Sequence, residues 1–227
     1  RLQNSEQQRR ALLADVTHEL RTPLTVVQGN LEALLDGVYP ADEAHLKPIL
    51  DETRVLSRLI DDLRTLSLAE SGALQLQREP VDLAVLATEA AASFRAQAEA
   101  AGVELAVTLG DDLPLLEIDP LRIREMFTNL IANALRHTPR GGRVGIAAQP
   151  DPARQWLTVS VSDTGQGISP DDLPHIFDRF YKSADSRGSG LGLAIAKNLV
   201  LMHGGEINAD SAPGQGTRIA FTLPMQS

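Results

Sequence analysis

Apolar residues recur every three or four positions over the first 70 residues and predict two amphipathic helices. The apolar stripe of the first run is Leu13, Val16, Leu20, Leu24, Val27, Leu31 and Leu34. Gly37 and Pro40 end this helix, and Asp42 is placed to cap a second helical run that continues to residue 70. Two helices joined by a short turn form an antiparallel hairpin over residues 1–70.

The two helices of this hairpin cannot enclose both apolar stripes by themselves. A homodimeric four-helix bundle buries both stripes, and packing of the hairpin against the rest of the chain is the alternative. The stripe extends along the first helix on both sides of His18. This length favours the dimer.

Helical and strand patterns interleave from residue 81 onward. The predicted helices cover residues 82–101, 120–137, 171–177 and 191–202, and the predicted strands cover residues 103–109, 115–118, 143–148, 156–162, 206–210 and 217–223. This order lacks regular βαβ repeats, so it predicts an α/β sandwich with a mixed sheet and helices on one face. The fold class is therefore α+β multidomain: the hairpin at 1–70, a linker at 71–80 and the α/β sandwich at 81–227.

The composition narrows the classes of partner. The chain has 227 residues with 21 Lys and Arg against 30 Asp and Glu, a net charge of −9, which argues against nucleic acid or an anionic membrane surface as the main partner. It has no cysteine, so disulfides and thiolate chemistry are excluded. No apolar run approaches the roughly 20 residues that span a bilayer. The chain begins at Arg1 within a helical pattern, and we expect it to be part of a longer protein.

His18 is the first candidate for chemistry. It lies two residues from both Val16 and Leu20, about 200° around the helix, and therefore points away from the apolar stripe into water. Glu19 is its neighbour, and Pro23 strains the helix one turn further on. An exposed imidazole beside a carboxylate is a nucleophile with an adjacent base. A solvated His-Glu pair without function is the alternative.

The other histidines lack this combination of exposure and an acidic neighbour. We expect His45 to be a solvated helix residue and His175 to be a loop residue. His203 is expected to be a cation at a helix end, where it interacts with the helix dipole.

Two glycine-containing motifs occur in the second half of the chain. Asp163 to Ile168 follows a predicted strand, and Asp163 there presents a carboxylate that can accept from an exocyclic amine such as that of adenine. An ordinary Asp-Gly turn is the alternative. Gly188 to Leu193 opens a predicted helix, whose first N–H groups can hold an anion. The context of this second motif fits neither the dinucleotide fingerprint nor the P-loop, so it indicates phosphate binding in a third kind of fold.

Polar and aromatic residues near these motifs complete the candidate site. Asn129 and Asn133 lie four residues apart on one helix face, where two amide oxygens can hold hydrated Mg²⁺. Arg136 and His137 follow and can meet phosphate charge. Two surface amides are the alternative for the Asn pair. Residues 176–182 concentrate the scarce aromatic side chains, which predicts an anchor beside a nucleotide lid, with a core patch as the alternative.

Taken in this order, the motifs resemble the catalytic portion of a sensor histidine kinase of two-component signalling, over residues 8–224. The matching segments are His18 to Leu24 for the H box, Asn129 to His137 for the N box, Asp163 to Gly167 for the first glycine box, Phe177 to Tyr181 for the F box, Gly188 to Gly192 for the second glycine box and Gly214 to Thr217 for the terminal glycine motif.

The resemblance implies a dimerisation and histidine-phosphotransfer hairpin joined to a Bergerat-type ATP-binding domain, with ATP and Mg²⁺ as cofactors. His18 would accept the γ-phosphoryl group, and Glu19 would accept or orient the imidazole proton. The phosphoryl group would then pass to an Asp of a response regulator receiver domain. Thr22 matches the family position that orients the hydrolytic water when the regulator is dephosphorylated.

The resemblance also implies a set of nucleotide-binding residues, with Asn129 and Asn133 as the magnesium ligands. The ATP-binding set is Asn129, Asn133, Arg136, His137, Asp163, Gly165, Gly167, Ile168, Phe180, Tyr181, Lys182, Arg187, Gly188, Ser189, Gly190, Leu191, Gly192 and Thr217. The chain departs from the family in its short lid at 183–187 and in Arg136, where Lys is common. We expect both departures to leave nucleotide binding intact.

Two other functions compete with the histidine kinase. One is a non-kinase ATPase of the same nucleotide-binding superfamily, which would have a carboxylate in place of Asn129 and would lack the His18 hairpin. The other is a nucleotide-sensing dimer without catalysis. We therefore expect a homodimeric kinase core with a response regulator as partner and no nucleic acid, forming the cytoplasmic portion of a membrane-anchored sensor. The signal, the cognate regulator and the choice between cis and trans autophosphorylation stay open.

Overall fold

The computed structural model describes residues 2–110, 113–151, 153–182 and 188–225. The chain divides into two compact units, Arg1–Arg64 and Thr65–Ser227. Among the described residues, no helix has both the length and the apolar character needed to cross a membrane.

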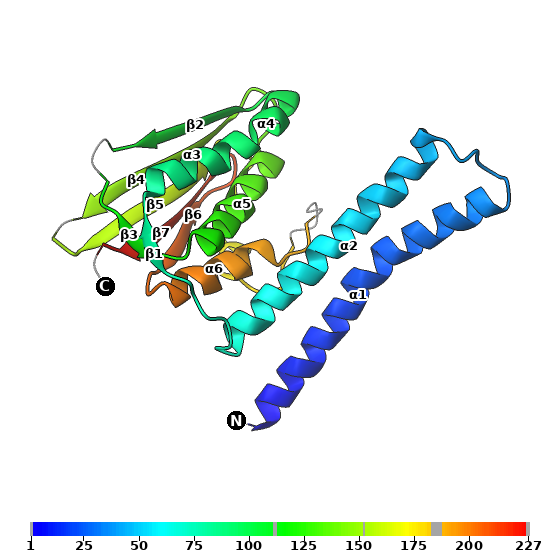
Figure 1. Cartoon of the computed structure of the whole chain (residues 1–227), viewed down its shortest axis with the longest axis horizontal. Coiled ribbons are helices and arrows are strands. Elements are labelled where there is room, and N and C mark those ends of the chain that lie inside the picture. The colour runs from blue at the N-terminus through cyan, green and yellow to red at the C-terminus, as the bar shows by residue number, and fades with distance from the viewer. Residues whose placement is uncertain (1, 111–112, 152, 183–187, 226–227) are drawn as a thin grey trace. The chain divides into compact units, whose positions relative to one another are not determined.

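The first unit is the predicted antiparallel hairpin. Helix α1 spans Leu2–Leu35 and helix α2 spans Glu43–Glu70, so the last turns of α2 belong to the second unit (Figure 1). Asp42 caps α2 as predicted, because its carboxylate accepts the backbone N–H of His45 at 3.1 Å. The same carboxylate oxygen lies 2.7 Å from Nδ1 of His45, and the imidazole stacks on the ring of Tyr39.

Many apolar side chains of the hairpin are exposed in the single chain. Val27 and Leu59 are buried, but most of the apolar side chains along both helices are not. The exposed ones are Leu13, Leu24, Val26, Leu31, Leu35, Leu46, Leu50, Val55 and Ile60. A hairpin with so much apolar surface in water needs a partner surface to cover it.

The second unit is built on a mixed five-stranded sheet. Its strands are β2 (Glu104–Leu109), β4 (Arg143–Asp151), β5 (Trp156–Asp163), β7 (Thr217–Pro224) and β6 (Ile207–Ser211), in this spatial order. Strands β2 and β4 are parallel, and the other neighbours are antiparallel. A separate antiparallel pair joins β1 (Glu79–Val81) to β3 (Leu116–Ile118).

Helices cover one face of this sheet, as predicted (Figure 1). They are α3 (Leu83–Ser93), α4 (Arg95–Ala101), α5 (Pro120–His137) and α6 (Gly192–Met202). Phe127 of α5 and Phe221 of β7 are buried and meet edge to face, with ring centroids 6.1 Å apart. The core thus lies between α5 and the middle of the sheet.

Several elements differ from the sequence predictions. The helix predicted over 82–101 is interrupted at Phe94, whose N–H donates to the carbonyl of Ala91 in a tight final turn of α3. Residues 171–177 hold only a single 3₁₀ turn, Leu173–His175. The connection predicted at 71–80 ends in strand β1, which is too short to show alternation. Strand β4 extends to Asp151, because Pro150 and Asp151 stay in register with β5.

The prediction for His203 is wrong. The residue is 1% exposed, and its Nδ1 donates to the carbonyl of Leu199 at 2.7 Å while its Nε2 accepts the backbone N–H of Asp119 at 3.1 Å. An acceptor nitrogen carries no proton, so the imidazole is neutral. Burial, followed by the charge of Arg78, lowers the pKa of His203, against the opposing effects of Leu199 and Asp119.

Asp119 joins the same cluster at the start of α5. Its Oδ1 caps the helix by accepting the N–H groups of Leu121 and Arg122, each at 3.1 Å. Its Oδ2 accepts the N–H of Gln77 at 2.9 Å. The segment that leads from α2 to β1 is therefore bonded to the beginning of α5.

The neutral state of His203 predicts a loss of stability in mild acid. The unfolded chain takes up a proton at this histidine near its ordinary pKa of 6.5, whereas the folded chain resists it. The stabilisation is thus complete above that pH and decreases as the pH falls below it. We expect the Tm of the wild-type chain to fall between about pH 7.5 and about pH 5.5, and to fall less in His203→Gln. The exposed His175 gives the control: His175→Gln should keep the wild-type slope, and identical slopes in all three proteins would contradict the assignment.

Candidate functional site

The first and the terminal glycine motifs meet at the carboxylate of Asp163. This residue ends β5, opposite Thr217 at the start of β7. Its Oδ1 accepts the N–H groups of Gly165 at 2.8 Å and of Thr217 at 3.2 Å. Among the described residues, Oδ2 has no hydrogen-bond partner. Burial raises the pKa of Asp163, against the lowering effects of these two N–H groups and of His137.

Close backbone contacts explain the glycines around this carboxylate. A Cβ at Gly165 would collide with the carbonyl of His137, and a Cβ at Gly167 would collide with the carbonyl of Ala212. A Cβ at Gly216 would collide with the carbonyl of Asp163 itself. Gly167 and Gly216 also have positive φ angles of 71° and 75°, which disfavour other residues. The first and the terminal glycine motifs are thus packed backbone to backbone.

Ser211 joins these two motifs from the end of β6. Its hydroxyl accepts the N–H of Ile168 at 2.9 Å and donates to the carbonyl of Gly216 at 2.8 Å. The hydroxyl oxygen of Thr217 lies 3.0 Å from the hydroxyl oxygen of Ser211. The sequence did not indicate Ser211, because a single serine at a strand end forms no motif.

The Asn pair lies on α5, with Asn129 facing the start of α6. Nδ2 of Asn129 is buried and has no hydrogen-bond partner among the described residues. A Cβ at Gly192 would lie 3.5 Å from this amide group. Asn133, one turn later, is half-buried. The orphaned amide marks a polar side chain that the protein alone does not satisfy.

Charged and aromatic side chains surround the second glycine motif. A Cβ at Gly188 would lie 2.6 Å from Nη1 of Arg136, so this glycine leaves room for the guanidinium. The carbonyl of Gly190 accepts the N–H of Phe180 at 2.9 Å. Phe180 has a φ of 59°, an uncommon conformation for a residue with a side chain. The hydroxyl of Tyr181 donates to the carboxylate of Asp172 at 2.5 Å.

The remaining residues of this motif lead into α6. Ser189 and Lys182 are half-buried. The hydroxyl of Ser189 accepts the N–H of Leu191 at 3.3 Å. Leu191 itself is fully buried. Among the described residues, the side chain of Leu191 at the N-cap of α6 makes no capping hydrogen bond, and the first N–H groups of a helix can bind an anion. Arg187, a predicted nucleotide contact, lies outside the described residues.

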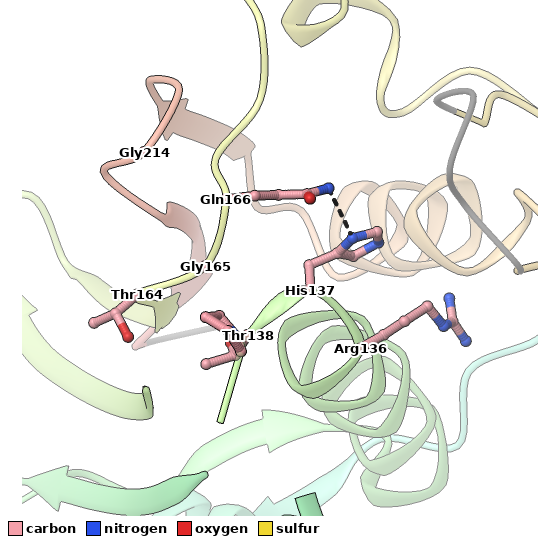
Figure 2. Close-up of a pocket in the computed structure, with 8 residues that line it drawn as sticks. Arg136, His137, Thr138, Thr164, Gly165, Gln166 and Gly214 are labelled. Atoms are coloured by element: carbon pink, nitrogen blue, oxygen red, sulfur yellow. Dashed lines mark hydrogen bonds between the residues drawn. The ribbon is translucent and has the colours of Figure 1, made fainter. Parts of the chain in front are cut away.

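A cavity of about 700 Å³ borders one end of this site (Figure 2). Its lining consists of Arg136, His137, Thr138, Pro139, Thr164, Gly165, Gln166 and Gly214. Nε2 of Gln166 lies 3.4 Å from Nδ1 of His137 across the hollow. Burial, followed by the charge of Arg136, lowers the pKa of His137. The lining does not include Asp163 or the Asn pair, so the cavity extends from the candidate site and does not coincide with it.

The candidate acceptor lies in the first unit. His18 is exposed, as predicted, and Glu19 beside it is half-buried. The exposed Thr22 donates its hydroxyl to the carbonyl of His18 at 3.4 Å. Pro23 lies inside α1 and is buried, and the helix continues past it to Leu35.

Family models match a segment in each half of the chain. Residues 8–72 match the model of the His Kinase A (phospho-acceptor) domain, and residues 118–227 match that of the histidine kinase-, DNA gyrase B-, and HSP90-like ATPases. The chain is 39% identical to the signal transduction histidine-protein kinase BaeS of Escherichia coli K12, over 99% of this chain and 49% of BaeS. It therefore spans about half the length of this curated relative.

Solved structures show the same fold over nearly the whole chain. The histidine kinase AdeS of Acinetobacter baumannii has a TM-score of 0.80 and 30% identity, covering 92% of this chain and 98% of that one. Full-length ShkA, in complex with AMPPNP, has a TM-score of 0.72 and 29% identity, covering 94% of this chain and 45% of that one. Together with the two family matches, these relatives show that the chain belongs to the sensor histidine kinases of two-component signalling.

Proposed function

We propose that this chain is the catalytic core of a sensor histidine kinase, which transfers the γ-phosphoryl group of ATP to His18 and then to an Asp of a response regulator. The observation that carries the proposal is the exposed His18, with Glu19 beside it, inside the match to the phospho-acceptor domain. Residues 118–227 of the same chain match the ATPase family. ATP bound there would supply the electrophile that such a histidine needs.

The geometry around Asp163 supports adenine binding. Its Oδ2, without a partner among the described residues, can accept a hydrogen bond from an exocyclic amine, while Oδ1 is held by Gly165 and Thr217. His137, whose carbonyl lies close to Gly165, and Ile168, which follows five residues after Asp163, would contact the base. The likeness to ShkA, whose structure contains AMPPNP, adds to this support.

Phosphate binding is proposed at the second glycine motif. Gly188, Gly190 and Gly192 allow close approach to the start of α6, where the N-cap side chain makes no capping bond and the helix dipole favours an anion. Arg136 beside Gly188 brings positive charge. Ser189, Leu191, Phe180, Tyr181, Lys182 and Arg187 would complete the phosphate and lid contacts.

The residues present also fit Mg²⁺. The buried amide of Asn129 has an atom without a partner, and rotation about the last side-chain bond exchanges its nitrogen and oxygen. Asn129 and Asn133 would therefore offer amide oxygens. An ion held in this way would take its other ligands from nucleotide phosphates and water. Bound Mg²⁺ would neutralise phosphate charge.

The chemical step follows from the side chains of the hairpin. A neutral imidazole nitrogen of His18 forms a bond to the γ-phosphorus, the bond from that phosphorus to the β,γ-bridging oxygen breaks, and ADP leaves. The carboxylate of Glu19 accepts the proton from the other imidazole nitrogen. The chain positions these groups, and positioning is the main contribution of a protein to phosphoryl transfer.

Partners follow from the same hairpin. The exposed apolar side chains along α1 and α2 support a homodimer with a four-helix bundle. The hairpin at 1–70 and the domain at 81–227 would carry the acceptor and the nucleotide site on separate bodies, with a hinge in the linker at 71–80 that lies ahead of Gln77, which is bonded to Asp119. A response regulator receiver domain would dock beside His18, and Thr22 would orient the water that hydrolyses its aspartyl phosphate.

Replacement of His18 tests the acceptor. After incubation with γ-labelled ATP, we expect acid-labile, alkali-stable label on the wild-type chain and on His45→Gln, and none on His18→Gln, because the attacking nitrogen is absent. His45 is the matched control, a histidine of the same hairpin that bonds to Asp42. Steady phosphate release from the wild-type chain without labelled protein would contradict the kinase and favour a non-kinase ATPase.

Replacement of Thr22 separates the two proposed activities. We expect Thr22→Ala to slow dephosphorylation of the regulator by about tenfold or more, because the water loses its orienting hydroxyl. Autophosphorylation of His18 should stay within about twofold of wild type, since Thr22 takes no part in that step. Thr25→Ala is the control: its hydroxyl bonds to the carbonyl of Arg21 one turn earlier. Equal loss of both activities in Thr22→Ala would argue against this role.

Replacement of Asn129 tests the magnesium site. In equilibrium binding of a fluorescent ATP analogue, we expect Asn129→Ala to lose about tenfold in affinity with Mg²⁺ present and to match the wild type in EDTA. Asn198→Ala removes a comparable amide, which bonds to the carbonyl of Ala194 in α6, and should behave as wild type. A loss of the same size with and without Mg²⁺ would overturn the role as a ligand.

A further inference from the structure

Ser211 makes three hydrogen bonds with one hydroxyl. A serine hydroxyl has a single proton to donate and two lone pairs to accept. The proton is committed to the carbonyl of Gly216, which can only accept, and one lone pair takes the N–H of Ile168. The contact with the hydroxyl of Thr217 at 3.0 Å must therefore be one in which Thr217 donates and Ser211 accepts.

This assignment fixes the hydrogen-bonding character of Thr217. Its only hydroxyl proton points to Ser211, so only lone pairs remain for any other group near it. Thr217 lies opposite Asp163 in the sheet, and its backbone N–H bonds to Oδ1 of that residue. The neighbouring Oδ2 is a carboxylate oxygen, which also accepts. Both side chains therefore offer acceptors at this end of the site.

We propose that Ser211 is a positioning residue that sets purine specificity, because it holds the Thr217 hydroxyl as an acceptor beside Asp163. The inference rests on the proposed nucleotide site. A 6-amino purine presents a donor to these acceptors, whereas a 6-oxo purine presents an oxygen that meets only lone pairs. Ser211 also anchors Ile168 and Gly216, so it holds the first and the terminal glycine motifs at the same spacing around Asp163.

Without the Ser211 hydroxyl, the Thr217 hydroxyl is free to rotate. It can then donate its proton to the oxygen of a 6-oxo purine, and the penalty against that base decreases. Loosening of the two glycine motifs would lower the affinities for the 6-amino and the 6-oxo purine by the same factor. The ratio of the two affinities is therefore the readout that a merely structural role of Ser211 would leave unchanged.

The experiment measures the affinities of the chain for ATP and GTP by calorimetry. We expect the wild type to prefer ATP, Ser211→Ala to reduce the ATP-to-GTP affinity ratio by about tenfold, and Ser211→Thr, which keeps the hydroxyl, to restore much of it. Ser160→Ala is the matched control, since Ser160 is a buried serine of β5 in the same sheet. Its ratio should equal that of the wild type.

Thr217→Val provides an independent variant, because it removes the hydroxyl and so should lower the ratio even if Ser211→Ala does not fold. A wild type that binds ATP and GTP equally would overturn the inference about Ser211. A folded Ser211→Ala whose affinities for ATP and GTP fall by the same factor would also overturn it. A wild type that binds neither nucleotide would instead overturn the proposed function, and this inference with it.

Discussion

Within the part of the chain that the structure describes, only one oxygen of the Asp163 carboxylate, Oδ1, accepts hydrogen bonds. The organisation of the candidate site in the second unit depends on this difference between its two oxygens. Oδ1 takes N–H groups from two turns that are far apart in the sequence, at Gly165 and Thr217. These bonds oppose the cost of burying a charge, which raises the pKa of the group. The glycines nearby lack side chains because the backbone segments approach too closely to admit one. The second oxygen then keeps its capacity for a ligand.

The two units of the chain differ in how much of their apolar surface they bury. In the second unit, α5 and the sheet enclose a core that includes Phe127 and Phe221. In the first unit, few side chains of the apolar stripes are buried. If a second copy covers them, the stability of the hairpin depends on the protein concentration, whereas that of the second unit does not. Chemical denaturation at different concentrations distinguishes the two behaviours.

Local signals in the sequence account for the features that were predicted. Asp119 followed by Pro120 placed the start of α5, and glycine clusters placed the turns around Asp163. The exposure of His18 followed from its spacing relative to Val16 and Leu20. Each of these depends on neighbours within about one helical turn, which a periodic pattern records.

The features that were missed depend on contacts between distant segments. His203 has the position of a helix-end cation, but its ring is buried against Asp119, 84 residues away. Ser211 bonds to Ile168, 43 residues away. Strand β1 exists because Glu79–Val81 pairs with β3. The spacing of residues within one segment does not indicate which distant segment it will contact. Burial and strand pairing that depend on such contacts can therefore be seen only in the folded chain.

The divided carboxylate of Asp119 has a consequence for coupling within the second unit. One oxygen caps α5, the helix that carries Asn129 and Asn133, and the other holds Gln77 in the segment after α2. Both contacts depend on the same carboxylate, and a lost cap costs a helix about 1 kcal/mol. A substitution at Asp119 therefore removes the cap of α5 and the attachment of Gln77 in a single change.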